Sequence, residues 1–298
     1  MYFLQVIING ILLGGIYAVV GLGMSLILGI VKLTNLAHGE FIILGAYAST
    51  IFSTMLGIDP LLTLFISVPL LFIFGYVLQR LFINSAMKRG AEPALLVTFG
   101  ISVILKDWML YQFKPDAQHV STEYAYNTIS LAGMDVSLLN ILLLLVSIVF
   151  IIGLKFLLDK TDIGRSIRAT ADDPVAASLS GINVPRTFAV AMGIAAATAA
   201  VAGTCVSMKW TFYPTSGGSY LLIAFVVVVI GGLGNIKGTL IAGILFGFIQ
   251  VLGGANYGLL ISYIFLILLL VLDPRTWLGR MIPDRGDKKN KGGARNEV

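Results

Sequence analysis

The sequence has few charged residues and a single cysteine. Asp, Glu, Lys and Arg make up 12% of the 298 residues, against about 25% in a typical soluble domain. So few charges cannot cover a chain of this length with groups that face water. Hydrophobic residues make up 57%, and the mean hydropathy is +0.93. A lipid bilayer is therefore the expected solvent, and the lone Cys205 excludes a disulfide within the chain.

Sequence motifs for catalysis, metal binding and nucleotide binding are also lacking. The two histidines, His38 and His119, lie far apart in the sequence and cannot form a metal cluster. The run 231–238 contains glycines and a lysine, but it lacks the G-x-x-x-x-G-K-[ST] pattern of a phosphate loop. The sequence therefore predicts no enzyme activity, no cofactor and no nucleotide site in this chain. The net charge of +5 lies in loops and the C-terminal tail, as the positive-inside rule expects, and needs no nucleic acid to explain it.

Long apolar runs recur along the chain. A helix that crosses a bilayer needs about 20 residues at 1.5 Å each. Charge-free runs of roughly this length or longer cover residues 1–31, 41–58, 60–79, 136–154, 187–208, 210–236 and 238–272. A further apolar run, 93–113, is interrupted only by Lys106 and Asp107. The pattern predicts an all-α fold, a polytopic transmembrane helical bundle with about eight or nine hydrophobic segments in one domain over residues 1–274.

Glycines interrupt the last part of this domain. Residues 210–272 are too long for one helix and just long enough for three, and the break falls near 230–238. Two alternatives remain open, three short crossings or one crossing plus a re-entrant hairpin. Gly231, Gly232 and Gly234 allow a sharp turn, and Asn235 can offer hydrogen bonds to exposed carbonyls or to a substrate. These four residues are candidates for the transport pathway.

Lys and Arg predict the orientation, because they concentrate on the cytoplasmic side of membrane proteins. The connections 80–92 and 159–186 and the tail from Arg275 hold 14 of these residues, whereas the connection 114–137 holds only Lys114. The N-terminus is expected outside and the C-terminus in the cytoplasm. The tail 275–298 is rich in Lys, Gly, Asp and Asn, a composition that predicts disorder.

Two polar segments stand out from the apolar background. The first, residues 33–40, separates the first two spans and contains Asn35, His38 and Glu40. It is either a plain turn at the cytoplasmic end, in which Glu40 suits the start of the next helix, or part of a gate at a helix break.

The second polar segment is the long cytoplasmic connection 159–187. Asp173 suits an N-cap, Pro174 a first helical residue and Gly181 a helix end, so 174–180 is expected to be a short helix outside the bilayer. A second short helix is expected over 164–170, where it carries Arg165 and Arg168. A solvated loop is the plain interpretation, and a docking element for a soluble partner is the functional one.

Small residues spaced four apart predict close helix packing. They include the pairs Gly10 and Gly14, and Gly243 and Gly247, and the stretch 189–203. Intrachain packing is the more common use of such residues, and contact with a second copy or a homologous partner is the other.

Several segments together resemble a known family. They are 9–29, 35–40 (N-L-A-H-G-E), 45–47, 164–171 (G-R-S-I-R-A-T-A) with Ala176, Ala177 and 181–182, and 229–238. Over roughly 5–272 the chain resembles permease subunits of ABC-type importers for branched-chain amino acids and the similar urea and short-chain amide systems. Leu36 stands where many members have Phe or Met.

The resemblance implies a multi-pass subunit of the prokaryotic inner membrane that forms the translocation pathway. It further implies a homologous second permease or a second copy, two cytoplasmic ATPase subunits and an extracellular or periplasmic binding protein as partners. ATP would be used by the partner subunits alone. The implied coupling segment contains Gly164, Arg165, Arg168, Asp172, Asp173, Pro174 and Gly181. The alternatives are a urea or amide permease and, from another class, a stand-alone channel or secondary transporter.

Overall fold

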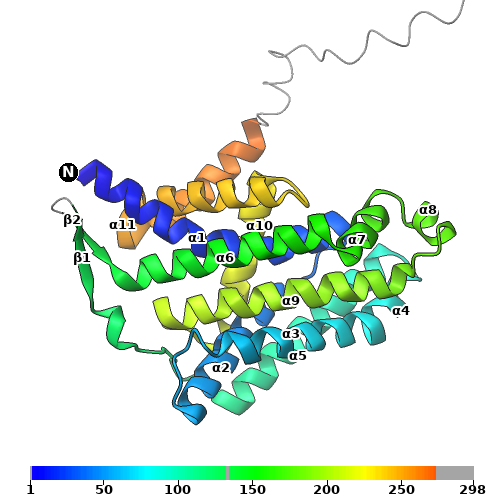
Figure 1. Cartoon of the computed structure of the whole chain (residues 1–298), viewed down its shortest axis with the longest axis horizontal. Coiled ribbons are helices and arrows are strands. Elements are labelled where there is room, and N and C mark those ends of the chain that lie inside the picture. The colour runs from blue at the N-terminus through cyan, green and yellow to red at the C-terminus, as the bar shows by residue number, and fades with distance from the viewer. Residues whose placement is uncertain (1, 132–133, 273–298) are drawn as a thin grey trace, which may run out of the picture.

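The computed structural model describes residues 2–131 and 134–272, and the predicted basic tail 275–298 lies outside this range. Eight helices are long and apolar enough to cross a membrane, which confirms the predicted helical bundle. Most of these helices run along the long axis of the molecule (Figure 1). The start of the chain and the strands 128–131 and 134–137 lie at one end of this axis, and the segment 162–179 lies at the other.

The helices follow one another along the chain, joined by connections of different lengths. They are α1 (Tyr2–Ile30), α2 (His38–Leu56), α3 (Leu64–Leu78), α4 (Asn84–Met87), α5 (Ala91–Phe113), α6 (Leu138–Lys160), α7 (Asp162–Asp172), α8 (Pro174–Leu179), α9 (Val184–Lys209), α10 (Gly217–Gly231) and α11 (Ile236–Leu272). A π-helical turn, Gln79–Ile83, joins α3 to α4, and 3₁₀ turns cover Glu123–Ala125 and Pro214–Ser216. The predicted span 93–113 is therefore a helix despite Lys106 and Asp107.

The long helices α1 and α9 form the centre of the bundle. α9 is almost completely buried, because its run of small residues lets α2 and α3 approach its backbone closely. A Cβ atom on Gly45 of α2 would lie 2.7 Å from the Cα of Ala200, and one on Gly75 of α3 would lie 2.6 Å from the Cβ of Ala196. Side chains larger than those present would therefore push these helices apart.

The two predicted glycine pairs meet each other. A Cβ on Gly10 of α1 would lie 2.7 Å from the Cα of Phe248 in α11, and one on Gly247 would lie 2.5 Å from the backbone nitrogen of Gly14. Gly243 packs in the same way on Ala18. The small residues thus serve intrachain packing, as the more common of the two interpretations expected.

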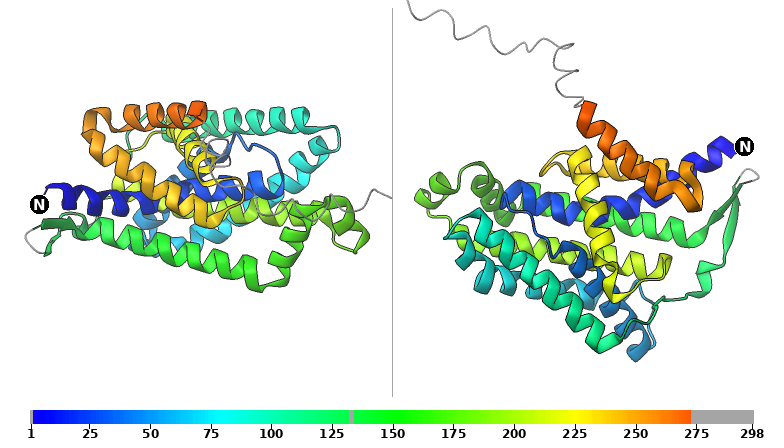
Figure 2. Two further views of the ribbon diagram at one scale, coloured as in Figure 1. Left: turned by 90° about the horizontal axis from the view of Figure 1, so that it is seen from above. Right: turned by 180° about the vertical axis from the view of Figure 1, so that it is seen from behind.

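The end of the chain forms three helical segments. α10 ends at Gly231, and α11 contains a break at Gly254, where φ is 67° and ψ is −175°. The segment before this break runs antiparallel to α1, because Ile244 packs near Gly14 and Phe248 near Gly10. α10 crosses the direction of the long helices in Figure 2. Three helical segments fit both alternatives for 210–272, three short crossings and one crossing plus a re-entrant hairpin.

Two extended segments enter the bundle from opposite ends. Residues 31–37 leave the end of α1 and run back along it to the start of α2 (Figure 2). Residues 210–216 leave the other end of α9 and lead to the start of α10. The order helix, extended segment, helix therefore occurs twice, first in α1, 31–37 and α2 and again in α9, 210–216 and α10. The two copies run in opposite directions, as in the inverted repeats of transporters.

The connection between α5 and α6 adds a small β-hairpin to the otherwise helical fold. β1 (Thr128–Leu131) pairs antiparallel with β2 (Met134–Ser137), with Thr128 opposite Ser137. Tyr124 donates its hydroxyl to both carboxylate oxygens of Asp59, at 2.8 and 3.1 Å. Burial and this carboxylate raise the pKa of the Tyr124 hydroxyl above its usual range. The contact fixes the hairpin connection on the α2–α3 turn.

Candidate functional site

The starts of α2 and α10 meet inside the bundle. A Cβ on Gly39 would overlap the carbonyl oxygen of Gly217, and a Cβ on Gly217 would lie 2.8 Å from Oε1 of Glu40. Nε2 of His38 lies 3.0 Å from the carbonyl oxygen of Val20. Val20 lies ten residues before the end of α1, which is about 15 Å along the axis and half of a hydrocarbon core of about 30 Å. The contact therefore lies near the middle of the membrane.

This position corrects one interpretation of residues 33–40. They do not form a plain turn at the cytoplasmic end, because the extended segment 31–37 carries the chain back to mid-membrane before α2 begins. The physical reason is the close approach of backbones at Gly39 and Gly217, which draws the start of α2 inward.

Asn35 holds the extended segment in place. Its side-chain Oδ1 accepts from the backbone nitrogen of Ala37 at 3.1 Å, and its Nδ2 lies 3.5 Å from Sδ of Met192 in α9. Thr98 of α5 contacts the same segment, since its hydroxyl accepts from the backbone nitrogen of Leu36 at 3.3 Å. The segment is thus bound to two helices.

His38 and Glu40 are buried polar residues with free bonding capacity. They are 1% and 4% exposed. Within the described residues, Nδ1 of His38 and Oε2 of Glu40 have no hydrogen-bond partner. Ser102 and Lys106 of α5 lie toward the Glu40 carboxylate. Because an unpartnered polar atom is costly in a buried site, such groups mark places where a polar ligand or water binds.

The glycine-rich turn predicted near 230–238 has a structural task. Gly232 and Gly234 have φ angles of 87° and 71°, which favour glycine. The backbone nitrogen of Gly234 donates to the carbonyl oxygen of Ser25 at 3.1 Å, so the turn is fixed on α1. Oδ1 of Asn235 accepts from the backbone nitrogen of Gly238 at 3.0 Å at the start of α11. Asn235 therefore uses its side-chain oxygen to cap the start of α11.

The turn lies apart from the contact at Glu40. Gly231 packs on Gly238, and Gly234 packs on Gly29 near the end of α1. The structure therefore brings Asn35, His38 and Glu40 together, and it places the four residues Gly231, Gly232, Gly234 and Asn235 at the other end of α10.

The connection 159–187 contains the two expected short helices, the first longer and the second shorter than predicted. α7 covers Asp162–Asp172 and packs on α6 through one face with Gly164, Ile167 and Thr170. A Cβ on Gly164 would overlap the backbone of Leu158, which explains the glycine. α7 is thus fixed on the end of α6.

Both arginines of α7 are engaged within the chain. Arg165 pairs with Asp162. Arg168 donates to the carbonyl oxygen of Leu158 and lies 3.8 Å from Oδ1 of Asp159. Arg168 therefore binds α7 to the last turn of α6. Both arginines thus have a partner within the chain, and their side chains are still 64% and 48% exposed.

The caps of α8 agree with the sequence prediction. Oδ1 of Asp173 accepts from the backbone nitrogens of Val175 and Ala176, at 2.8 and 3.1 Å, and Pro174 is the first helical residue. Gly181 has a φ of 86° just after the helix. Asp172 is exposed beside this cap. The short helix is thus well defined at both ends.

Sequence reasoning missed the apolar surface of α8. Val175 and Leu179 are 70% and 86% exposed, although they lie on a helix beyond the membrane-spanning segments. Their spacing of four residues puts them on one face. A cavity of about 450 Å³ lies between α7 and the start of α9, next to Ile163 and Ile182. The sequence signal for this surface was the presence of two apolar residues four positions apart in a polar loop.

Metal chemistry has no support in the described part of the chain. No group of three or more His, Cys, Asp or Glu side chains that could hold an ion occurs within residues 2–131 and 134–272. The single Cys205 is buried in α9.

Comparison with known proteins gives a consistent picture. The family model described as "Branched-chain amino acid transport system / permease component" matches residues 6–272. The high-affinity branched-chain amino acid transport system permease protein BraD of Pseudomonas aeruginosa is 29% identical, over 94% of this chain and 96% of its own length.

Two further relatives widen the comparison. The permease protein LivH of Escherichia coli, from a high-affinity branched-chain amino acid transport system, is 28% identical over 94% of this chain and 96% of its own length. The ribose import permease protein RbsC of Haemophilus influenzae is 27% identical over 86% of this chain and 80% of its own length. No solved structure matches. With a family model that matches almost all of the membrane domain, the chain belongs to the family of branched-chain amino acid transport system permease components.

Proposed function

We propose that this chain forms the translocation pathway of an ATP-driven importer for branched-chain amino acids. The family match over residues 6–272 carries the proposal. The chain is a multi-pass membrane permease, and ATP hydrolysis and substrate capture belong to other subunits. We further propose two cytoplasmic ATPase subunits, an extracellular or periplasmic binding protein, and a second permease that is either a homologue or a second copy. No cofactor is expected in this chain.

The ATPase is proposed to bind at α7 and α8. α8 offers Val175 and Leu179 to a partner, and its capped ends make it a rigid element. α7 connects it to α6 through Gly164 and Arg168. A movement of the ATPase would therefore be transmitted to a membrane-spanning helix through close backbone contact.

The substrate is proposed to pass the contact between α2 and α10. The supporting observations are the mid-membrane depth of His38 and the unpartnered atoms of His38 and Glu40. A carboxylate and a histidine at this depth can bind the ammonium and other polar groups of an amino acid. Opening requires α2 and α10 to separate at Gly39 and Gly217.

Reconstitution tests the proposed function. The chain is placed in proteoliposomes with its partner permease, ATPase subunits and binding protein, and uptake of radioactive leucine, ribose and urea is measured with and without ATP. We expect ATP-dependent leucine uptake. Uptake of ribose or urea alone would assign another substrate class, and transport by the purified chain without ATP would indicate a channel or secondary transporter.

Labelling tests the proposed orientation, with the N-terminus outside and the C-terminus in the cytoplasm. In a Cys205→Ser background, Tyr126→Cys and Ser178→Cys introduce exposed thiols in the α5–α6 connection and in α8. A membrane-impermeant reagent on intact cells is expected to label position 126 and not position 178. The reverse pattern would overturn the orientation and the proposed ATPase site.

A further inference from the structure

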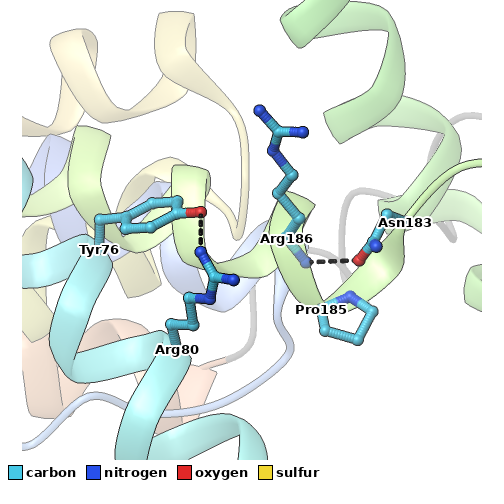
Figure 3. Close-up of a pocket in the computed structure, with 5 residues that line it drawn as sticks. All are labelled: Tyr76, Arg80, Asn183, Pro185 and Arg186. Carbon is cyan, nitrogen blue, oxygen red and sulfur yellow. Dashed lines mark hydrogen bonds between the residues drawn. The ribbon is translucent and has the colours of Figure 1, made fainter.

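A polar cavity lies between the ends of α3 and α9. It has a volume of about 630 Å³, and its lining residues are Tyr76, Arg80, Asn183, Pro185 and Arg186. In Figure 3, Arg80 points toward the Tyr76 hydroxyl, and the Arg186 side chain extends from α9 away from these two residues. α9 begins directly after the α7–α8 connection, so the cavity belongs to the same end of the molecule.

The cavity is positively charged. Arg80 donates to the Tyr76 hydroxyl at 3.3 Å, and Arg186 lies across the cavity on α9. Neither arginine lies within 4.0 Å of a carboxylate in the described part of the chain, whereas Arg165 and Arg168 both do. Two guanidinium groups are thus available for an anion from outside the chain.

The frame of the cavity is fixed by backbone contacts. Nδ2 of Asn84 donates to the carbonyl oxygen of Pro185 at 2.9 Å, which joins α4 to the start of α9. Oδ1 of Asn183 accepts from the backbone nitrogen of Arg186 at 3.1 Å and caps α9. The π-helical turn Gln79–Ile83 widens α3 at Arg80, and such turns are often found at functional sites.

An exposed apolar surface leads from the membrane to this cavity. Ile73 and Val77 of α3 are 60% and 40% exposed, and they precede Arg80 by seven and three residues, so all three share one side of the helix. Both arginines lie near the ends of spans, 64–87 and 184–209. This depth is that of lipid headgroups, with acyl chains along Ile73 and Val77.

We propose that the cavity binds the phosphate of an anionic phospholipid such as phosphatidylglycerol. The planar guanidinium groups of Arg80 and Arg186 bind phosphate oxygens through paired hydrogen bonds, and the Tyr76 hydroxyl adds a donor. Basic pockets between spanning helices are suited to anionic headgroups. The bound lipid joins the ends of α3 and α9, next to the connection proposed to contact the ATPase.

Native mass spectrometry of the full-length chain in detergent tests the proposal, with phosphatidylglycerol and phosphatidylcholine added in separate titrations. The Arg80→Gln/Arg186→Gln variant is expected to bind phosphatidylglycerol about fivefold more weakly for each arginine removed. The control Lys88→Gln/Arg89→Gln removes two exposed charges from the same end and is expected to bind as the wild type. Phosphatidylcholine binding is expected to be unchanged in both.

Additional variants and competing ligands identify the bound molecule and control for misfolding. Arg80→Lys/Arg186→Lys keeps the charge without the planar fork and should give an intermediate affinity. Inorganic phosphate in large excess should leave the lipid bound. Equal phosphatidylglycerol binding by the Gln variant and its control would overturn the proposal. Displacement by inorganic phosphate, or a cross-link from position 80 to another subunit in the assembled importer, would assign the cavity to a free anion or to a protein contact instead.

Discussion

Two helix starts in this chain differ in nearly every respect. α8 begins in an exposed connection, and the Asp173 carboxylate accepts from two backbone nitrogens in its first turn. α2 begins near the middle of the membrane after Ala37, without a side-chain cap, and its first residues His38, Gly39 and Glu40 are buried. α8 keeps its polar groups satisfied and presents Val175 and Leu179 outward. α2 keeps polar atoms unpartnered and buried.

This difference in capping and burial indicates different functions for the starts of α8 and α2. A helix with complete caps and exposed apolar residues is suited to bind another protein, because its shape does not depend on that partner. A helix start with buried and unpartnered polar atoms is costly unless a ligand uses them. We therefore propose that α8 binds a partner and that substrate passes the start of α2. The predictions below test this separation, beginning with the largest effect.

The close contact between Gly39 and Gly217 predicts the largest effect. Gly39→Val would place side-chain atoms on the backbone of Gly217, and the two helices cannot both keep their positions. We expect a loss of at least about 3 kcal/mol in folding free energy, seen as loss of the monodisperse peak in size-exclusion chromatography. Gly153→Val in α6 is the control, because no atom lies within 4 Å of its added Cβ. Similar profiles for the two variants would show that α2 and α10 do not touch as described.

Glu40→Gln tests the buried carboxylate at the start of α2. The change keeps the shape and removes the charge, so we expect leucine uptake by the reconstituted importer to fall by about tenfold or more. The ATPase subunits should still co-purify. Glu92→Gln is a matched control, since Glu92 also lies in the first turn of a helix, α5, but is exposed. Wild-type uptake by Glu40→Gln would remove this carboxylate from the pathway.

Leu179→Asp tests the exposed surface of α8. Leu179 is 86% exposed, so the change should leave the permease folded and weaken ATPase binding by about tenfold through loss of an apolar contact. Co-purification of the ATPase subunits measures this. Ser178→Asp, on the neighbouring exposed position of the same helix, is expected to bind them normally. Equal binding by both variants would place the docking surface elsewhere.

The caps of α8 give a smaller effect. Asp173→Gly with Pro174→Gly removes the cap and the preset first residue, which should cost about 1 kcal/mol in local helix stability. We expect an inserted and paired permease with reduced substrate-stimulated ATP hydrolysis. Arg168→Glu should act in the same direction, because Arg168 binds α7 to the carbonyl oxygen of Leu158. Normal stimulation with a demonstrably disrupted helix would make this connection a solvated loop.

The smallest effect is expected at the α10–α11 turn. Gly232→Ala places a Cβ on a residue with a φ of 87°, at a cost of about 1 kcal/mol. A thermal shift of a few degrees at most is expected, with uptake retained. Gly218→Ala in α10 is the control, because no atom lies within 4 Å of its added Cβ.

Sequence patterns that depend on local chemistry predicted much of this fold. Apolar length located the spans, and small residues four apart indicated that Gly10, Gly14, Gly243 and Gly247 lie on closely packed helix faces. The cap of α8 was predictable because Asp173 and Pro174 act on their immediate neighbours.

Features that depend on distant contacts could not be predicted. The sequence of 33–40 fits a turn or a gate, and only the contact of His38 with Val20 of α1 places it near the middle of the membrane. Arg168 reads as an exposed basic residue, yet the carbonyl oxygen of Leu158 accepts its hydrogen bond. The polar cavity between the ends of α3 and α9 is lined by residues from 76–80 and 183–186, which are about a hundred positions apart. Such pairs have no signal in a single sequence.

The ratio of leucine transported to ATP hydrolysed, measured in one reconstituted importer, tests the separation of tasks most directly. The account predicts that Glu40→Gln lowers this ratio, because ATP hydrolysis continues while substrate passage fails. It predicts that Leu179→Asp lowers both rates together and leaves the ratio near that of the wild type. The opposite assignment, a lowered ratio in Leu179→Asp and parallel losses in Glu40→Gln, would contradict it.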